Sequence, residues 1–270
     1  MPMASRTRWI AALLLPRIER TRGRGTRVVL PMAWLVLPIA VLGLLLWPGG
    51  CASTSSTVRP ISKSKCPIRV NILSGAASDG ATAVELSATK APSIHTSNNP
   101  APKQLNLPAG GKYVLRHTSE GWKVNNTLLG TGELVVVPSD PDSFAVNGEK
   151  YRGEYHFVPT SPGKFDVVNH VDIDEYLRGL GELPGGWPLE AHKAQAIAAR
   201  TYALYEKSTA AASKRHWDVY ADTRSQVYKG LAGENEKTTA AADQTASVVL
   251  VHGPAGSEKI FKAYYSACCG

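Results

Sequence analysis

Glu182 is the residue of this chain whose type and surroundings best suit acid–base chemistry. It is the one carboxylate in a turn-rich connection over residues 181–186, with Leu183 beside it and Trp187 just beyond. Apolar neighbours can desolvate a carboxyl group, and desolvation raises its pKa towards the value that a general acid needs. The alternative interpretation is a solvent-facing turn residue without chemistry.

A helix rich in alanine must follow this turn and position what surrounds it. Pro188 suits its first helical position, and six alanines lie between residues 191 and 203. Small side chains around the circumference indicate a helix packed closely on most sides. Lys193 and Arg200 share one stripe of it with aliphatic residues. A buried cation needs a partner, so both either pair with carboxylates as scaffold or line a polar cleft.

A shorter helix is predicted before the turn. Asp172 can cap its N-terminus and Glu175 lies three residues later, the spacing of a capping box. Gly179 is suited to end the helix, because glycine readily adopts the backbone conformations that follow a last helical turn. The turn that holds Glu182 is therefore expected between two helices.

Short strands dominate the rest of the sequence. Alternating apolar residues or β-branched runs predict strands over residues 68–73, 83–88, 112–116, 121–124, 133–137, 144–146, 150–158 and 165–170. Asn147-Gly148 predicts a hairpin between two of them. After the Ala-rich helix, a short strand is expected within 216–223, a helix over 234–245, and two strands over 247–252 and 259–265. The predicted class is α+β, a β-strand-rich domain with a central Ala-rich helix.

The net charge of +8 is concentrated at the N-terminus. Residues 1–27 hold seven arginines and one glutamate, which is +6 of that total and leaves +2 for the remainder. The high pI therefore gives no argument for nucleic acid as a partner, and none is expected.

An uncharged segment follows this basic flank. Residues 28–47 are 20 residues without a charge, long enough to span a bilayer. The preceding arginines place their side in the cytoplasm and everything from Cys51 onward outside it. Residues 1–50 are thus expected to be a basic flank plus a membrane anchor or a signal segment. Cys51 follows a glycine, as in a bacterial lipoprotein, so it is a candidate lipidation site and a lipid anchor is the alternative.

Cysteine and histidine spacing argues against a metal centre. Cys66 could pair with Cys268 or Cys269 in an exported protein, but no C-x-x-C pair occurs and the histidines are scattered. We therefore expect no metal and no cofactor. A Ser-His-Asp triad is not indicated either, since no Gly-x-Ser-x-Gly motif occurs.

Five segments carry a family resemblance. They are VNGEKYRG (146–153), VVNHVDIDEYLRG (167–179), ELPGGWPLEAHKAQAIAARTYAL (182–204), SQVYKG (225–230) and IFKAYYSACCG (260–270). Over residues 66–270 the chain resembles the stage II sporulation protein D / amidase enhancer LytB (SpoIID/LytB) family. Composition predicts a Ser/Thr-rich tether over 51–65 and strand patterns a β-rich part over 66–168, and the resemblance implies a SpoIID/LytB catalytic core over 169–270.

The resemblance implies action on peptidoglycan glycan strands. Its sporulation branch is understood as a lytic transglycosylase, which cleaves MurNAc-GlcNAc bonds. The family's catalytic acid lies in an E-M-P segment that corresponds to Glu182 with Leu183 and Pro184. Candidate substrate contacts are Lys193, Gln195, Arg200, Tyr202, Gln226, Tyr228, Tyr264 and Ser266. For five members of this set packing in the core or in turns is the alternative, namely Tyr202, Gln226, Tyr228, Tyr264 and Ser266.

One carboxylate restricts the chemistry. Ordinary glycoside hydrolysis needs two carboxyl groups, whereas a lytic transglycosylase uses the muramic acid 6-hydroxyl as the nucleophile and forms a 1,6-anhydro ring. Glu182 could protonate the leaving oxygen and then accept the 6-hydroxyl proton. The alternatives are a non-catalytic amidase enhancer or wall-binding module, with a cell-wall amidase as partner, and a structural scaffold of the envelope.

Two departures from the family pattern stand out. Only Leu180 and Gly181 separate the Y-L-R-G segment from Glu182, about two residues fewer than usual, which could shift the carboxylate. The family also continues beyond the position of Gly270 with a further glycine and a threonine. The resemblance therefore implies a core that is truncated at its C-terminus.

The charge pattern predicts the topology of the chain. A reporter fused after Lys65 should be active only outside the cytoplasm, because the arginines hold the opposite side of the apolar segment inside. Parallel fusions to alkaline phosphatase and to a cytoplasm-only fluorescent protein measure this. The same fusions lacking residues 1–50 serve as the control, and fluorescence from the full fusion would contradict the prediction.

Overall fold

The computed structural model describes residues 66–77, 83–105, 107–125, 127–254 and 257–265. All of them belong to one compact unit, Ser64–Tyr265. Among these residues no helix has the length and apolar character needed to cross a bilayer. The predicted apolar segment over 28–47 and the sites at Cys51, Ser266, Cys268 and Cys269 lie outside the described residues.

A seven-stranded sheet forms the largest element. Its order is β12 (Val219–Tyr220), β1 (Pro67–Ala77), β11 (Lys164–Asp172), β10 (Glu154–Ser161), β8 (Leu134–Val137), β3 (Ser93–Thr96) and β4 (Asn99–Gln104). β1 pairs antiparallel with β11 from Pro67–Asp172 to Ala77–Lys164 and parallel with β12. Because β11 runs through residues 168 and 169, a strand crosses the boundary expected between the β-rich part and the core.

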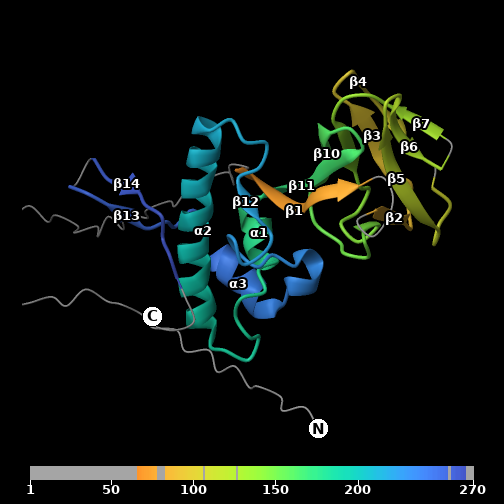
Figure 1. Cartoon of the computed structure of the whole chain (residues 1–270). Coiled ribbons are helices and arrows are strands. Elements are labelled where there is room, and N and C mark those ends of the chain that lie inside the picture. The colour runs from red at the N-terminus through yellow and green to blue at the C-terminus, as the bar shows by residue number, and fades with distance from the viewer. Residues whose placement is uncertain (1–65, 78–82, 106, 126, 255–256, 266–270) are drawn as a thin grey trace, which may run out of the picture. The chain divides into compact units, whose positions relative to one another are not determined.

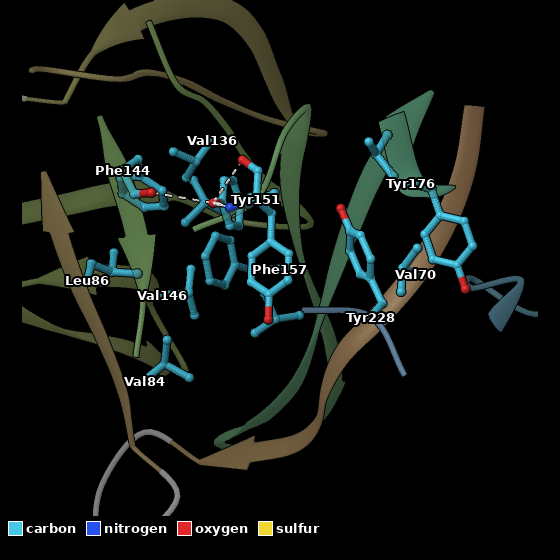
Figure 2. Packing of buried hydrophobic residues seen from close by; sticks show 14 of the residues in the cluster. Val70, Val84, Leu86, Val136, Phe144, Val146, Tyr151, Phe157, Tyr176 and Tyr228 are labelled. Atoms are coloured by element: carbon cyan, nitrogen blue, oxygen red, sulfur yellow. Dashed lines mark hydrogen bonds between the residues drawn. The ribbon is translucent and has the colours of Figure 1, made fainter. Parts of the chain in front are cut away.

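A five-stranded sheet packs against the first. Its order is β7 (Thr127–Gly130), β6 (Gly121–Val124), β5 (Lys112–Thr118), β2 (Val84–Ala88) and β9 (Phe144–Val146). Trp122 of this sheet has its ring 5.0 Å from that of Phe165 and 6.1 Å from that of Phe157, both in the seven-stranded sheet. Figure 2 shows residues of the two sheets facing each other in the resulting core.

The hairpin predicted at Asn147-Gly148 is present only as a turn. Both residues have positive φ, 52° and 84°, and Val146 and Glu149 exchange two hydrogen bonds of 3.0 Å, as expected for a tight two-residue turn. The predicted pairing of residues 144–146 with 150–158 is wrong, because β9 pairs with β2 while β10 pairs with β8 and β11.

Gly153 provides the physical reason for this change of sheet. Its φ is +81°, and a Cβ at this position would clash with the backbone carbonyl of His170 on β11. The chain therefore approaches β11 closely just before β10 begins, and it enters the seven-stranded sheet instead of continuing alongside β9.

The helices confirm the predicted arrangement around Glu182. α1 (Ile173–Arg178) begins at the N-cap Asp172 and ends at Gly179. Asp172 accepts hydrogen bonds from the N–H of Asp174 at 3.0 Å and of Cys66 at 3.1 Å, in place of the predicted capping box with Glu175. The cap thus also fastens the start of β1 to α1.

The Ala-rich helix α2 (Leu189–Ala212) is closely packed, as predicted. From residue 189 to residue 207 only Glu190 is exposed, and Ala199 and Ala203 are fully buried. The neighbours of α2 include α1, α3 (Glu236–Gln244), β1, β12 and β14 (Lys259–Ile260). Figure 1 shows α1 and α3 on one side of α2 and the hairpin of β13 (Val251–His252) and β14 on the other. A short 3-10 helix, η1 (Gly230–Gly233), precedes α3.

Overpacking of α2 tests this arrangement. Ala199→Leu should lower the free energy of unfolding by about 1–3 kcal/mol, since added methylenes in a filled core force neighbours apart. Ala211→Leu, at an exposed position of the same helix, should change it by no more than about 0.5 kcal/mol. Urea unfolding of the parent and both variants measures the difference. Equal stability of the two variants would mean that Ala199 has free space beside it.

Candidate functional site

The turn that carries Glu182 is held by a neighbouring loop. The Gly181 N–H donates to the Val227 carbonyl at 2.9 Å, and the Lys229 N–H donates to the Gly179 carbonyl at 2.9 Å. Leu180 and Tyr228 form the antiparallel bridge between these two bonds. The short turn after α1 is therefore paired along its length, which fixes the backbone from which the Glu182 side chain projects.

The Glu182 carboxylate accepts three hydrogen bonds from described groups. Gln195 Nε2 and the Tyr265 hydroxyl donate to Oε2, each at 2.6 Å, and the Val227 N–H donates to Oε1 at 3.1 Å. Gln195 comes from the second turn of α2, and its predicted role as a substrate contact stays a prediction. The interaction is between the two side chains themselves.

Burial dominates the electrostatics of Glu182. Desolvation raises the pKa of the Glu182 carboxyl group above its ordinary value, although the hydrogen bonds from Tyr265, the Val227 N–H and Gln195 each oppose the rise. No ion pair within the described ranges involves Glu182, so no cation there cancels the effect of burial. A raised pKa favours the protonated carboxyl group, which is the form of a general acid.

A chain of hydrogen bonds orients Tyr265 towards Glu182. Gln226 is fully buried, and its Nε2 donates to the Tyr265 hydroxyl at 2.7 Å and to the Ala199 carbonyl at 3.3 Å. The Tyr176 hydroxyl donates to Gln226 Oε1 at 3.0 Å. Because Tyr265 accepts from Gln226, its own proton is directed to Glu182. Burial and the neighbouring Glu182 charge also raise the pKa of Tyr265, which keeps it a donor.

Tyr228 has a packing role in this arrangement. Its ring lies 5.4 Å from that of Tyr151 and 4.8 Å from that of Tyr176, and its hydroxyl donates to Asn169 Oδ1 at 3.1 Å. Figure 2 shows Tyr151, Tyr228 and Tyr176 in succession. A Cβ on Gly179 would lie 2.6 Å from the Tyr228 ring, so glycine is needed there for this close approach.

Arg200 and Lys193 make ion pairs within the protein. Arg200 is 2% exposed, and its guanidinium donates to Asp174 at 2.8 Å, which fits the scaffold alternative. Lys193 lies nearer the surface and pairs with the exposed Glu190 at 2.8 Å. Their assignment as substrate contacts stays a prediction.

The two predicted tyrosine contacts outside this network lie near each other. Tyr202 is 6% exposed, with its ring 6.4 Å from that of Tyr264, and Tyr264 is 78% exposed. The Lys262 ammonium lies 5.4 Å and 5.0 Å from these two rings. Among the predicted sugar contacts that the structure describes, Tyr264 is the most open to solvent, and this role also stays a prediction.

Sequence reasoning missed Tyr265 and selected its neighbour Tyr264. The strand predicted over 259–265 covers only Lys259–Ile260 in the structure, but strand alternation in the predicted segment would already have placed Ala263 and Tyr265 on one side. Ala263 is 5% exposed, so the side that it shares with Tyr265 is the inward one. The small Ala263 was the available signal. The sequence could not have indicated the Val227 N–H as a partner of Glu182, because every residue except proline has the same backbone N–H group.

A comparison with known proteins matches a region that contains Glu182, Gln195 and Val227 but not Tyr265. A family model described as Stage II sporulation protein (SpoIID) matches residues 161–252. That range contains α1, the Glu182 turn, α2 and α3.

Two relatives extend the comparison. An uncharacterized protein of Brachyspira hyodysenteriae is 37% identical over 152 residues, which are 56% of this chain and 39% of that protein. A Bacillus subtilis protein named Amidase enhancer is 30% identical over 170 residues, 61% of this chain and 22% of that protein. The chain thus spans well under half the length of either relative. The resemblance to the SpoIID/LytB family found in the sequence is confirmed over residues 161–252, where the family model matches.

Proposed function

We propose that this chain acts on bacterial cell-wall peptidoglycan as a lytic transglycosylase, with Glu182 as its single acid and base. The observation that carries the proposal is the half-buried Glu182 carboxyl group, whose pKa is raised by desolvation and whose position is fixed by three hydrogen-bond donors. The name of the Bacillus subtilis relative, Amidase enhancer, supports a cell-wall role in general. The domain is proposed to work outside the cytoplasm, held there by the segment before it.

The proposed reaction consumes no water, because the nucleophile is a hydroxyl group of the substrate itself. The Glu182 carboxyl proton passes to the glycosidic oxygen as the bond from that oxygen to the muramic acid C1 breaks. The 6-hydroxyl oxygen of the same sugar then bonds to C1, and its proton returns to the Glu182 carboxylate. Tyr265 and Gln195 donate to the carboxylate while it is charged, which stabilises it between the two proton transfers.

Hydrolysis is the alternative reaction and would need a second carboxylate. Asp218, a candidate from its place near the site in sequence, is 1% exposed and accepts three hydrogen bonds from Arg69. Asp222 is paired with Arg224 at 2.7 Å. Both carboxylates are engaged with arginines, which favours the single-carboxylate route.

Removal of the acid tests the chemistry. Glu182→Gln keeps the size of the side chain but cannot transfer a proton, so turnover of denuded glycan strands should fall about 10²–10⁴-fold while binding remains. Glu236→Gln, at an exposed position of α3, is the matched control. Mass spectrometry of the products should find 1,6-anhydro ends. Reducing ends would identify a hydrolase, and undiminished turnover by Glu182→Gln would exclude the proposed role.

The pH profile tests the hydrogen bond from Tyr265. The protonated Glu182 is the active acid, so turnover persists below its pKa and is lost as pH rises through it. Tyr265→Phe removes a donor that favours the charged form and should move this loss to higher pH. Tyr264→Phe is the control and should leave the position of the loss unchanged. A shift to lower pH in Tyr265→Phe would contradict the assignment.

The amidase-enhancer alternative rests on the name of the relative. If the chain acts only by binding, Glu182→Gln and the parent should stimulate a purified cell-wall amidase equally, and neither should release anhydro products. The transglycosylase proposal requires release by the parent alone.

A further inference from the structure

A small pocket lies directly beside Glu182. Helices α1, α2 and α3 all contribute to its walls, together with the turn before α2. Most of the lining is apolar, and these residues are Leu177, Leu180, Leu183, Ala196 and Ala241. An apolar cavity next to a proposed acid is the place where a group attached to the reacting sugar would be seated.

Three polar side chains line the same pocket besides Glu182, and two of them are engaged. Gln195 donates its amide to Glu182 at 2.6 Å. Thr238 completes the capping box of α3 with Asn235. The third is His192, which is 4% exposed and whose Nε2 is buried without a hydrogen-bond partner. A buried polar atom left unpaired lowers stability unless a ligand satisfies it.

The state of His192 determines what such a ligand must offer. Burial and the charge of Lys237 lower the pKa of the His192 imidazole, which favours the neutral ring. Its other ring nitrogen is hydrogen-bonded to the Pro184 carbonyl and therefore carries the proton. Nε2 is then a bare acceptor, and it requires an N–H or O–H donor.

We propose that this pocket binds the 2-acetamido group of an amino sugar in the glycan strand, with the amide N–H donated to His192 Nε2 and the methyl group against the leucines and alanines. A trans amide presents its N–H and its acyl methyl on the same edge. One edge of the acetamido group therefore satisfies both the unpaired acceptor and the apolar walls. The inference rests on the proposed function, because it takes the glycan strand as the ligand.

Other substituents of the strand fit less well. A free 2-amino group would bring a cation into an apolar pocket when protonated, and it has no methyl to fill the space. A carboxylate would meet both Glu182 and the bare acceptor of His192 without a donor for either. The pocket should therefore make the protein selective for N-acetylated over de-N-acetylated strands.

The experiment compares binding of three kinds of glycan strand to the full chain carrying Glu182→Gln, which removes cleavage from the measurement. The first sample is denuded glycan strands, and the second is the same strands after de-N-acetylation. The third is the de-N-acetylated strands re-acylated with butyryl groups. All three are measured at a pH where free amines are largely uncharged. Acetylated strands should bind about tenfold more tightly than either other form, the size expected from one hydrogen bond and one filled apolar site.

Two further variants identify the pocket as the cause. His192→Leu in the same background keeps an apolar bulk but removes the acceptor, and the preference for acetylated over de-N-acetylated strands should fall several-fold. Leu183→Ala enlarges the pocket at a half-buried position, and butyrylated strands should gain affinity relative to acetylated ones. Circular dichroism checks that both variants are folded.

The outcomes separate this inference from the proposed function. Equal binding of acetylated and de-N-acetylated strands overturns the inference. It is also overturned if His192→Leu keeps the full preference for acetylated strands and Leu183→Ala keeps the parent's preference for acetyl over butyryl groups. Cleavage by the parent without any acetyl preference leaves the transglycosylase intact and removes the pocket. An acetyl preference that depends on His192, in a parent that releases no anhydro products, supports the pocket and removes the transglycosylase.

Discussion

A guanidinium group buried among helices is the interaction on which the site depends. Arg200 of α2 is 2% exposed, and a buried charge persists in a folded protein only when it is paired. Its partners are Asp174 at the start of α1 and, at the end of α3, the Ala242 carbonyl and the Thr245 hydroxyl. Because these partners belong to α1 and to the end of α3, α2 must lie against both helices. The same three helices form the walls of the pocket beside Glu182.

A second chain of contacts connects the sheets to the acid. Ring contacts run from Tyr155 through Tyr151 and Tyr228 to Tyr176, and hydrogen bonds continue from Tyr176 through Gln226 and Tyr265 to Glu182. The carboxyl group is thus oriented by residues that are themselves immobilised in the core. The apolar walls that would receive an acetamido methyl also help to keep water from Glu182. A seated substrate would exclude more water, which favours the protonated acid at the moment when it is needed.

Local patterns of the sequence determined the elements around the site. The cap at Asp172, the stop at Gly179 and the alanines of α2 depend on neighbours within one or two helical turns, so they can be inferred without tertiary information. Strand positions over most of the β-rich part were predictable for the same reason. The short strands β3, β4 and β7 were not singled out, because four to six residues of mixed polarity give little periodicity. Glu182 was identified from the turn and the family resemblance together.

Only the tertiary structure decided which distant groups meet. The choice of Tyr265 over Tyr264 as the partner of Glu182 depends on which side of the segment faces inward, and a contact across 83 residues sets that. The departure of β10 from β9 likewise depends on the close approach of Gly153 to β11. Arg200 pairs with Asp174 of α1 rather than with Glu182, and the described partners of Glu182 include no cation. Residue type and spacing fix local backbone preferences. The burial that raises the pKa of Glu182, and the hydrogen bonds that oppose this rise, exist only once separate segments are packed together.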